Sequence, residues 1–287
     1  MNPTMFQCGR FDFTSRQRPL VMGILNVTPD SFSDGGQHDT LDAARRRADQ
    51  MVAEGADIID IGGESTRPGS PRVPLQQELD RVLPVVEALR DCGAVLSVDT
   101  YKPDVMRAVL RTGADMINDI WGFRQPGAVE AVAAPEAGRA ALCVMHMQGD
   151  PETMQKDPHY DDVVGEVHDF LQAQVETLQA AGVDRARIVL DPGFGFGKTS
   201  AHNLALLNRL PACAPAGYPI LVGMSRKSML GAVTGRDAAG RLHGSLAAAL
   251  IAVERGAAVV RVHDVAATVD VLRVSWAVRQ ENAKADY

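Results

Sequence analysis

The chain has 287 residues, 46% of them hydrophobic, and a formal net charge of −7. This length and apolar content allow one large domain, and the acidic balance excludes a broad nucleic-acid-binding surface. No apolar segment is long enough to span a bilayer, the N-terminus has no signal peptide, and the four cysteines form no Cys-x-x-Cys pair. We therefore expect a cytoplasmic protein with neither a membrane nor a nucleic acid as partner.

One pattern recurs along the chain: a helical segment ends in glycine, and a short β-branched run follows, as in RGAAVVRVH at 255–263. Glycine just past a helix accepts the left-handed conformation that ends it, and short apolar runs are typical of strands buried on both faces. The pattern predicts eight strands, at 20–25, 57–61, 94–98, 115–118, 139–145, 187–190, 219–223 and 258–262.

Each predicted strand is followed by a helical segment, which indicates a single α/β (β/α)₈ TIM barrel over residues 20–287. Residues 1–19 are expected to form a short N-terminal extension that packs at the bottom of the barrel. A doubly wound open sheet would normally carry Gly-x-Gly-x-x-Gly after its first strand, but NVTPDSFSDGG at 26–36 stands there instead.

The segment LDPGFGFGKT at 190–199 has the order of parts of a phosphate-binding loop. Such a loop needs a glycine separated by four residues from Gly-Lys-Thr. That position holds Pro192, which has no N–H to donate, and Gly193 is one residue too close. We therefore predict a strand that ends in Asp191, followed by a glycine-rich turn, rather than a nucleotide site.

Polar side chains stand where the predicted strands end. They are Asn26, Asp60, Asp99, Asn118, His146, Asp191, Ser225, Arg226, Lys227, Arg261 and His263. A single Asp or Asn often caps a helix or a turn. Eight polar strand ends together favour a functional site, because the chemistry of barrel enzymes lies at this end.

Arg261 and His263 lie two residues apart on the last strand and should point the same way. Their burial requires either nearby carboxylates or a bound anion, and the last strand favours the anion. Asp99, Asn118 and Asp191 supply acceptors and an amide that suit a flat heterocycle with amino and carbonyl groups. Long polar insertions after the first two strands are predicted to act as lids.

The chain resembles the dihydropteroate synthase family in seven blocks that follow one another from the first strand to the last. They are GILNVTPDSFSDGG (23–36), DIIDIGGESTRPGS (57–70), SVDTYKP (97–103), INDIWG (117–122), LDPGFGFGK (190–198), GMSRKS (223–228) and RVHDV (261–265). The resemblance implies a homodimeric barrel that joins 6-hydroxymethyl-7,8-dihydropterin diphosphate to para-aminobenzoate in folate biosynthesis. Pyrophosphate would leave with Mg²⁺ present.

The resemblance also implies roles for individual residues. Asn26 would bind Mg²⁺, and Arg261, His263, Lys227 and Arg67 would take part in catalysis. The residues implied in substrate binding are Asp99, Asn118, Asp191, Met145 and Lys227 for the pterin, Thr66, Arg261 and His263 for the diphosphate, and Phe32, Arg67, Pro68, Phe196 and Ser228 for the aminobenzoate. Residues 124–139 match no motif.

Two alternatives use the same pterin pocket. A methyltetrahydrofolate-binding methyltransferase barrel would need Asp99, Asn118 and Asp191 but no diphosphate clamp, so Arg261 and His263 speak against it. A non-catalytic pterin-binding paralogue would release no pyrophosphate, and the intact motifs disfavour it.

Overall fold

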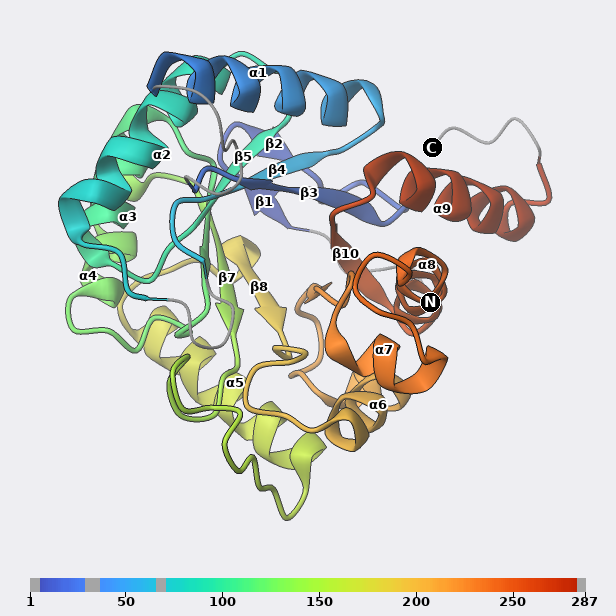
Figure 1. Cartoon of the computed structure of the whole chain (residues 1–287). Helices are drawn as coiled ribbons and strands as arrows, with labels where there is room; N and C mark the ends of the chain where they lie inside the picture. Colours follow the sequence, from blue (N-terminus) through green and yellow to red (C-terminus); the bar gives the residue numbers. More distant parts are fainter. Residues whose placement is uncertain (1–5, 29–36, 66–70, 283–287) are drawn as a thin grey trace.

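The fold is a closed barrel of eight parallel strands surrounded by helices (Figure 1). The computed structural model describes residues 6–28, 37–65 and 71–282. The barrel strands are β3 (Leu20–Asn26), β4 (Ile58–Gly62), β5 (Val95–Asp99), β6 (Met116–Asp119), β7 (Ala141–Met145), β8 (Ile188–Asp191), β9 (Ile220–Val222) and β10 (Ala257–Val262). They pair in chain order, and β10 closes the barrel on β3. The predicted (β/α)₈ barrel is confirmed, and each predicted strand overlaps an observed one.

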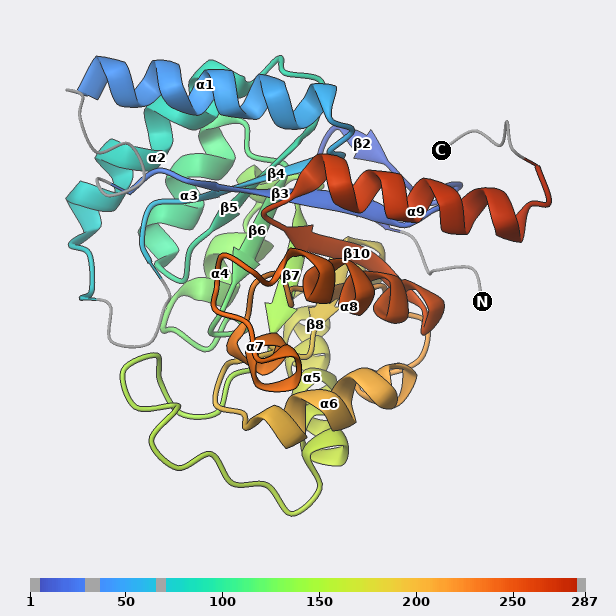
Figure 2. The ribbon, with the colours of Figure 1, turned by 45° about the vertical axis from the view of Figure 1, so that its right-hand side comes forward.

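Helices cover the outside of the barrel (Figures 1 and 2). They are α1 (Gln37–Ala53), α2 (Leu75–Leu89), α3 (Pro103–Thr112), α4 (Ala128–Ala133), α5 (Val163–Ala180), α6 (Ser200–Asn208), α7 (Ser228–Thr234), α8 (Leu242–Glu254) and α9 (Val265–Arg279). In α3 the fixed φ of Pro103 starts the helix, and Gly113, at φ 118°, ends it. No helix in the described part of the chain is both long and apolar enough to cross a bilayer.

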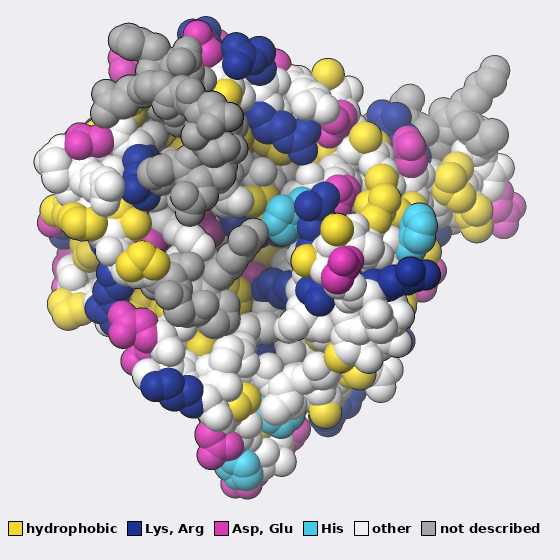
Figure 3. All heavy atoms as spheres, viewed as in Figure 1, with side chains coloured by type: hydrophobic (Ala, Val, Ile, Leu, Met, Phe, Trp, Pro, Cys, Tyr) yellow, Lys and Arg dark blue, Asp and Glu magenta, His cyan; other side chains and the backbone are white. Residues whose placement is uncertain are grey.

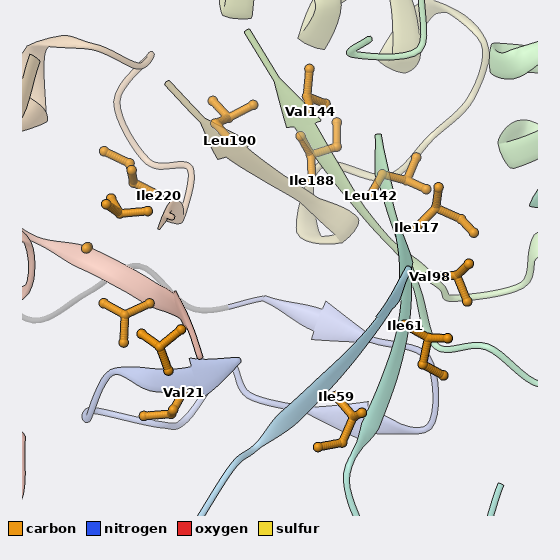
Figure 4. Packing of buried hydrophobic residues seen from close by; sticks show 14 of the residues in the cluster. Val21, Ile59, Ile61, Val98, Ile117, Leu142, Val144, Ile188, Leu190 and Ile220 are labelled. Atoms are coloured by element: carbon orange, nitrogen blue, oxygen red, sulfur yellow. The ribbon is translucent and has the colours of Figure 1, made fainter. Parts of the chain in front are cut away.

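The strands are buried on both faces, so they carry two apolar layers. Their outward side chains pack under the helices, as Ile59, Val98 and Leu142 do in Figure 4. Their inward side chains, such as Met22 and Val95, fill the lower part of the barrel. This double burial explains why the strands are continuous apolar runs rather than alternating ones.

The N-terminal segment forms a hairpin of β1 (Gln7–Cys8) and β2 (Phe11–Asp12). Phe6, Cys8 and Phe13 are buried in the same cluster as the lower inward side chains of the barrel. The hairpin therefore lies at the N-terminal ends of the strands. This arrangement leaves the opposite end, where the polar residues gather, as the mouth of the barrel.

Candidate active site

Charged and polar side chains from four strands meet inside the mouth. Arg261 of β10 donates from Nε to Asp60 Oδ2 at 2.6 Å and from Nη2 to Asp99 Oδ2 at 3.0 Å. Asp60 also accepts from Ser97 Oγ at 2.6 Å and from Asn118 Nδ2 at 3.2 Å. The strand ends on β4, β5, β6 and β10 therefore converge on one site, although they are far apart in the sequence.

Asp60 has a larger part in this cluster than its sequence position indicated. It is completely buried, and its strand, IIDIG, carries no other charged residue. A charge in a buried strand must be paired, so the strand itself held the signal for a partner. Of the two alternatives for Arg261, carboxylates or an anion, the structure shows the carboxylates. Its Nη1 makes no hydrogen bond to the described residues.

Asp99 and Asp191 are buried carboxyl groups with raised pKa values. Burial raises the pKa of Asp99 to about 7, with Arg261 opposing the change and Asp60 adding to it. Burial also raises the pKa of Asp191, against the opposing effects of Lys227 and of the Gly193 N–H, which donates to Asp191 Oδ1 at 2.7 Å. Asp99 Oδ1 is buried and has no hydrogen-bond partner among the residues that the structure describes. Such an acceptor is costly unless a ligand donates to it.

Lys227 lies beside these carboxylates because the preceding residue, Arg226, adopts a left-handed φ of 60° and turns the chain. The Lys227 ammonium donates to Phe194 O and lies 4.6 Å from the centroid of the Phe196 ring. Burial lowers its pKa to about 8, while Asp191 opposes the change. Lys227 therefore still carries its charge at neutral pH.

His263 follows β10 and turns toward the end of β9. Its Nδ1 lies 3.0 Å from Ser225 Oγ, and its backbone N–H donates to the same oxygen at 3.2 Å. Arg261 instead reaches across the barrel to β4 and β5. The Arg261 and His263 side chains, which the sequence placed on one side, thus contact different partners.

An apolar shelf borders the polar cluster. It consists of Ile120, Met145, Met147 and Met154, with Tyr101, Trp121 and Phe196 packed against them. Of the other predicted residues, Ser228 begins α7 and is exposed. Thr66, Arg67, Pro68 and Phe32 lie outside the described residues, as do the central parts of both predicted lids, 29–36 and 66–70.

Asn26 ends β3 at the mouth and is exposed. Within the described ranges, its amide has no hydrogen-bond partner, and no cluster of three or more His, Cys, Asp or Glu could hold a metal. A single free amide oxygen fits Mg²⁺, which keeps several waters and takes few protein ligands beside substrate phosphates.

A second charged network lies beside β4 and β5, and the sequence did not predict it. The Lys102 ammonium pairs with both Glu64 and Glu78, and Tyr101 Oη donates to Glu64 at 3.1 Å. Glu78 is 1% exposed. The sequence feature that could have indicated this network is Lys102 of the SVDTYKP block, which lies just after the end of β5.

Figure 3 shows a hollow near the centre of the face seen in Figure 1, with Lys and Arg side chains in it and beside it. The site thus combines cations, buried acceptors and an apolar wall. The arrangement suits the binding of a flat, polar molecule with an anionic end.

Comparisons with known proteins agree with this chemistry. The family described as pterin binding enzyme matches residues 22–263. A protein of Escherichia coli K12 named dihydropteroate synthase is 52% identical over 257 residues, which are 89% of this chain and 90% of that protein.

Solved structures are equally similar. The Burkholderia cenocepacia dihydropteroate synthase complexed with 7,8-dihydropteroate is 59% identical, covers 98% of both chains and has a TM-score of 0.90. The Xanthomonas albilineans dihydropteroate synthase with 4-aminobenzoic acid is 53% identical, covers 91% of this chain and 93% of that one, and has a TM-score of 0.85. This chain belongs to the pterin-binding enzyme family and, within it, to the dihydropteroate synthases.

Proposed function

We propose that the barrel mouth joins 6-hydroxymethyl-7,8-dihydropterin diphosphate to para-aminobenzoate. The arylamine nitrogen forms a bond to the methylene carbon of the pterin while the carbon–oxygen bond to the diphosphate breaks. The electron pair of that bond leaves with pyrophosphate, and the amine proton passes to solvent. The product is 7,8-dihydropteroate.

The observation that carries this proposal is the buried Oδ1 of Asp99, which has no partner among the described residues and belongs to the residue paired with Asn118 in the strand register. A pterin ring offers amino and ring N–H donors together with carbonyl and ring-nitrogen acceptors. Asp99 and Asp191 accept from the donors, while Asn118 and Lys227 donate to the acceptors. The apolar shelf, including Met145, covers one side of the flat ring.

The diphosphate lies at the cationic side of the mouth. Arg261 keeps its Nε and Nη2 on Asp60 and Asp99, so its Nη1 is left to donate to a phosphate oxygen. His263 and Thr66 contribute further contacts. Donors fixed before the reaction stabilise the charge that develops on the leaving group without reorganising, and two carboxylates fix Arg261 in this way.

The Mg²⁺ ion would bind at the mouth of the barrel, beside the diphosphate. Asn26 would hold Mg²⁺ through its amide oxygen, and the bound ion would neutralise charge on the diphosphate. The arylamine is neutral at pH 7 and needs no strong base, so the protein mainly orients two flat substrates. Phe196 and Ser228, with Phe32, Arg67 and Pro68, bind the aminobenzoate.

The test is an assay of pyrophosphate release with the pterin diphosphate and para-aminobenzoate, with and without Mg²⁺. We expect release only when both substrates are present, and a large loss on chelation. Release without aminobenzoate, or none with both substrates, would contradict the proposal. Methyl transfer from methyltetrahydrofolate to a corrinoid would instead support the methyltransferase alternative.

Three further properties belong to this proposal. The chain forms a homodimer, which light scattering after gel filtration would measure as a mass of about twice 30.7 kDa. The four cysteines are all free, which fits the reducing cytoplasm. Sulfonamides compete with para-aminobenzoate, as the solved complex of the Yersinia pestis enzyme with a sulfonamide drug supports.

A further inference from the structure

The loop at 193–197 turns its carbonyl groups toward side-chain donors. Lys198 Nζ donates to Gly193 O and to Phe196 O, both at 3.0 Å. The carbonyls between and after them accept from Lys227, Gln155 and Tyr160. A phosphate loop does the opposite, since it presents successive N–H groups to an anion. The carbonyls of the glycine-rich motif therefore accept from side-chain donors of the protein, two of them lysines, and the motif does not form a phosphate site.

The glycines make this arrangement possible. Gly193, Gly195 and Gly197 have φ values of 71°, 79° and 62°. A Cβ on Gly193 would lie 1.8 Å from His146 O, and one on Gly197 would lie 2.8 Å from Gln148 O. The loop can lie against the segment after β7 only because these residues have no side chain.

Lys198 is the centre of the loop. It is 3% exposed, and besides the two loop carbonyls its Nζ contacts His146 Nδ1 at 2.8 Å. Burial, and then the charge of Lys198, lower the pKa of His146 to about 2. The neutral imidazole can thus accept through Nδ1. The carbonyl of His146 is a fourth acceptor, 3.4 Å from Nζ. Protein acceptors therefore occupy the N–H groups of Lys198, and it has no donor left for a substrate.

These contacts have a consequence at the mouth. The Phe196 carbonyl is held by Lys198 from inside the protein, while the Phe196 ring lies near Lys227 and packs against the apolar shelf. We propose that Lys198 is a positioning residue that fixes Phe196 for the aminobenzoate and so sets the affinity for that substrate. This inference rests on the proposed function and adds to it a residue that touches neither substrate.

The test compares Lys198→Met with Lys156→Met, the same change at an exposed lysine whose side chain makes no hydrogen bond or ion pair with the described residues. We expect Lys198→Met to raise KM for para-aminobenzoate by about tenfold, because a misplaced binding group lowers affinity without altering the reacting groups. The KM for the pterin diphosphate and kcat should stay within about twofold, and Lys156→Met should match the wild-type enzyme. A general structural defect would not separate the two KM values.

Two results would overturn the role of Lys198. One is a KM for aminobenzoate equal in both variants, and the other is an equal rise in the KM of both substrates. Absence of turnover in the wild-type chain would instead remove the proposed function, and this inference with it.

If circular dichroism shows that Lys198→Met does not fold, the Tyr160→Phe variant tests the proposal instead. This change removes only the hydroxyl that donates to Gly197 O at 2.8 Å at the far end of the loop. A selective rise in KM for aminobenzoate supports the proposal, and an unchanged KM overturns it.

Discussion

At the residue scale, the charge balance of the mouth depends on Asp60, Asp99 and Arg261. Asp60 and Asp99 are 0% and 8% exposed, and burying a carboxylate is costly unless a cation is paired with it. Burial by itself would lower the pKa of Arg261, but Asp60 and Asp99 raise it by more. The guanidinium therefore stays charged. One cation thus compensates two acids, and the cluster fixes its own geometry.

Replacing Asp60 by Ala tests this dependence. The change leaves Arg261 with one carboxylate partner and removes the acceptor of Ser97 and Asn118. Since breaking a buried ion pair leaves an uncompensated charge, we expect the free energy of unfolding to fall by about 3 kcal/mol.

Urea denaturation measures this loss. The control is Asp104→Ala, which removes an exposed partner of Arg107 and should change the free energy of unfolding by less than about 1 kcal/mol. Equal small effects in the two variants would contradict the central role of Asp60.

Asp99 gives a second prediction, on pH. Its pKa is about 7 in the folded chain and about 3.9 in an unfolded one. As pH rises between these values, the unfolded chain loses the proton first, so the contribution of Asp99 to stability falls and then levels off above about pH 7. The loss approaches about 1.4 kcal/mol per pH unit.

Asp99→Asn removes this titration. We expect the free energy of unfolding of the wild-type protein, relative to the variant, to decrease from about pH 5 to pH 7 and to be constant above that range. Denaturation curves at several pH values measure it, and a constant difference over the whole range would contradict the raised pKa.

The sequence predicted that Asp99, Asn118 and Arg261 would converge, because all strands of a parallel barrel end at one rim. It did not predict that Asp60 would be the partner of Arg261. That pairing depends on the register, in which Asp60 lies opposite Ser97, two residues before Asp99 and on the same face of the strand. Register is a property of the closed barrel and not of a single strand.

At the scale of elements, the strands were predictable because apolar runs follow helix-ending glycines. The segment 124–139 was not, since it holds a six-residue helix, α4, and a 3₁₀ turn at Pro135–Ala137, which are too short for a periodic pattern. Pro84 lies inside α2, which nevertheless runs from Leu75 to Leu89.

Glycine in the β8–α6 connection gives a prediction at this scale. Gly193→Ala combines a left-handed φ with a Cβ 1.8 Å from His146 O, so the backbone must move. Gly182→Ala has a φ of 90° as well, but its Cβ would meet no atom within 4 Å. We expect Gly182→Ala to cost about 1 kcal/mol and Gly193→Ala at least about 3 kcal/mol.

Thermal and urea denaturation of both variants measure the difference. Similar losses would show that backbone conformation alone, and not the close approach to His146, makes glycine necessary in this loop.

At the scale of the whole molecule, the two ends of the barrel have different tasks. The N-terminal hairpin fills the lower end with Phe6 and Phe13, while the upper end holds the charged cluster, whose buried carboxylates reduce stability. The sequence predicted an extension packed at the bottom of the barrel, and residues 6–13 lie there. It did not indicate that their aromatic side chains complete the inner core, because contacts between side chains far apart in the sequence are decided by tertiary packing.

This division predicts that stability and substrate binding can be changed separately. Phe13 is 5% exposed, so Phe13→Ala should lower the free energy of unfolding by about 3 kcal/mol. Both KM values should stay within about twofold of the wild-type values below the unfolding temperature, because the mouth is at the opposite end. Val278→Ala, at an α9 residue that is 71% exposed, is the control and should alter neither. A change in KM for either substrate in Phe13→Ala would mean that packing at the bottom of the barrel reaches the charged cluster through the strands, and that the two ends are one cooperative unit.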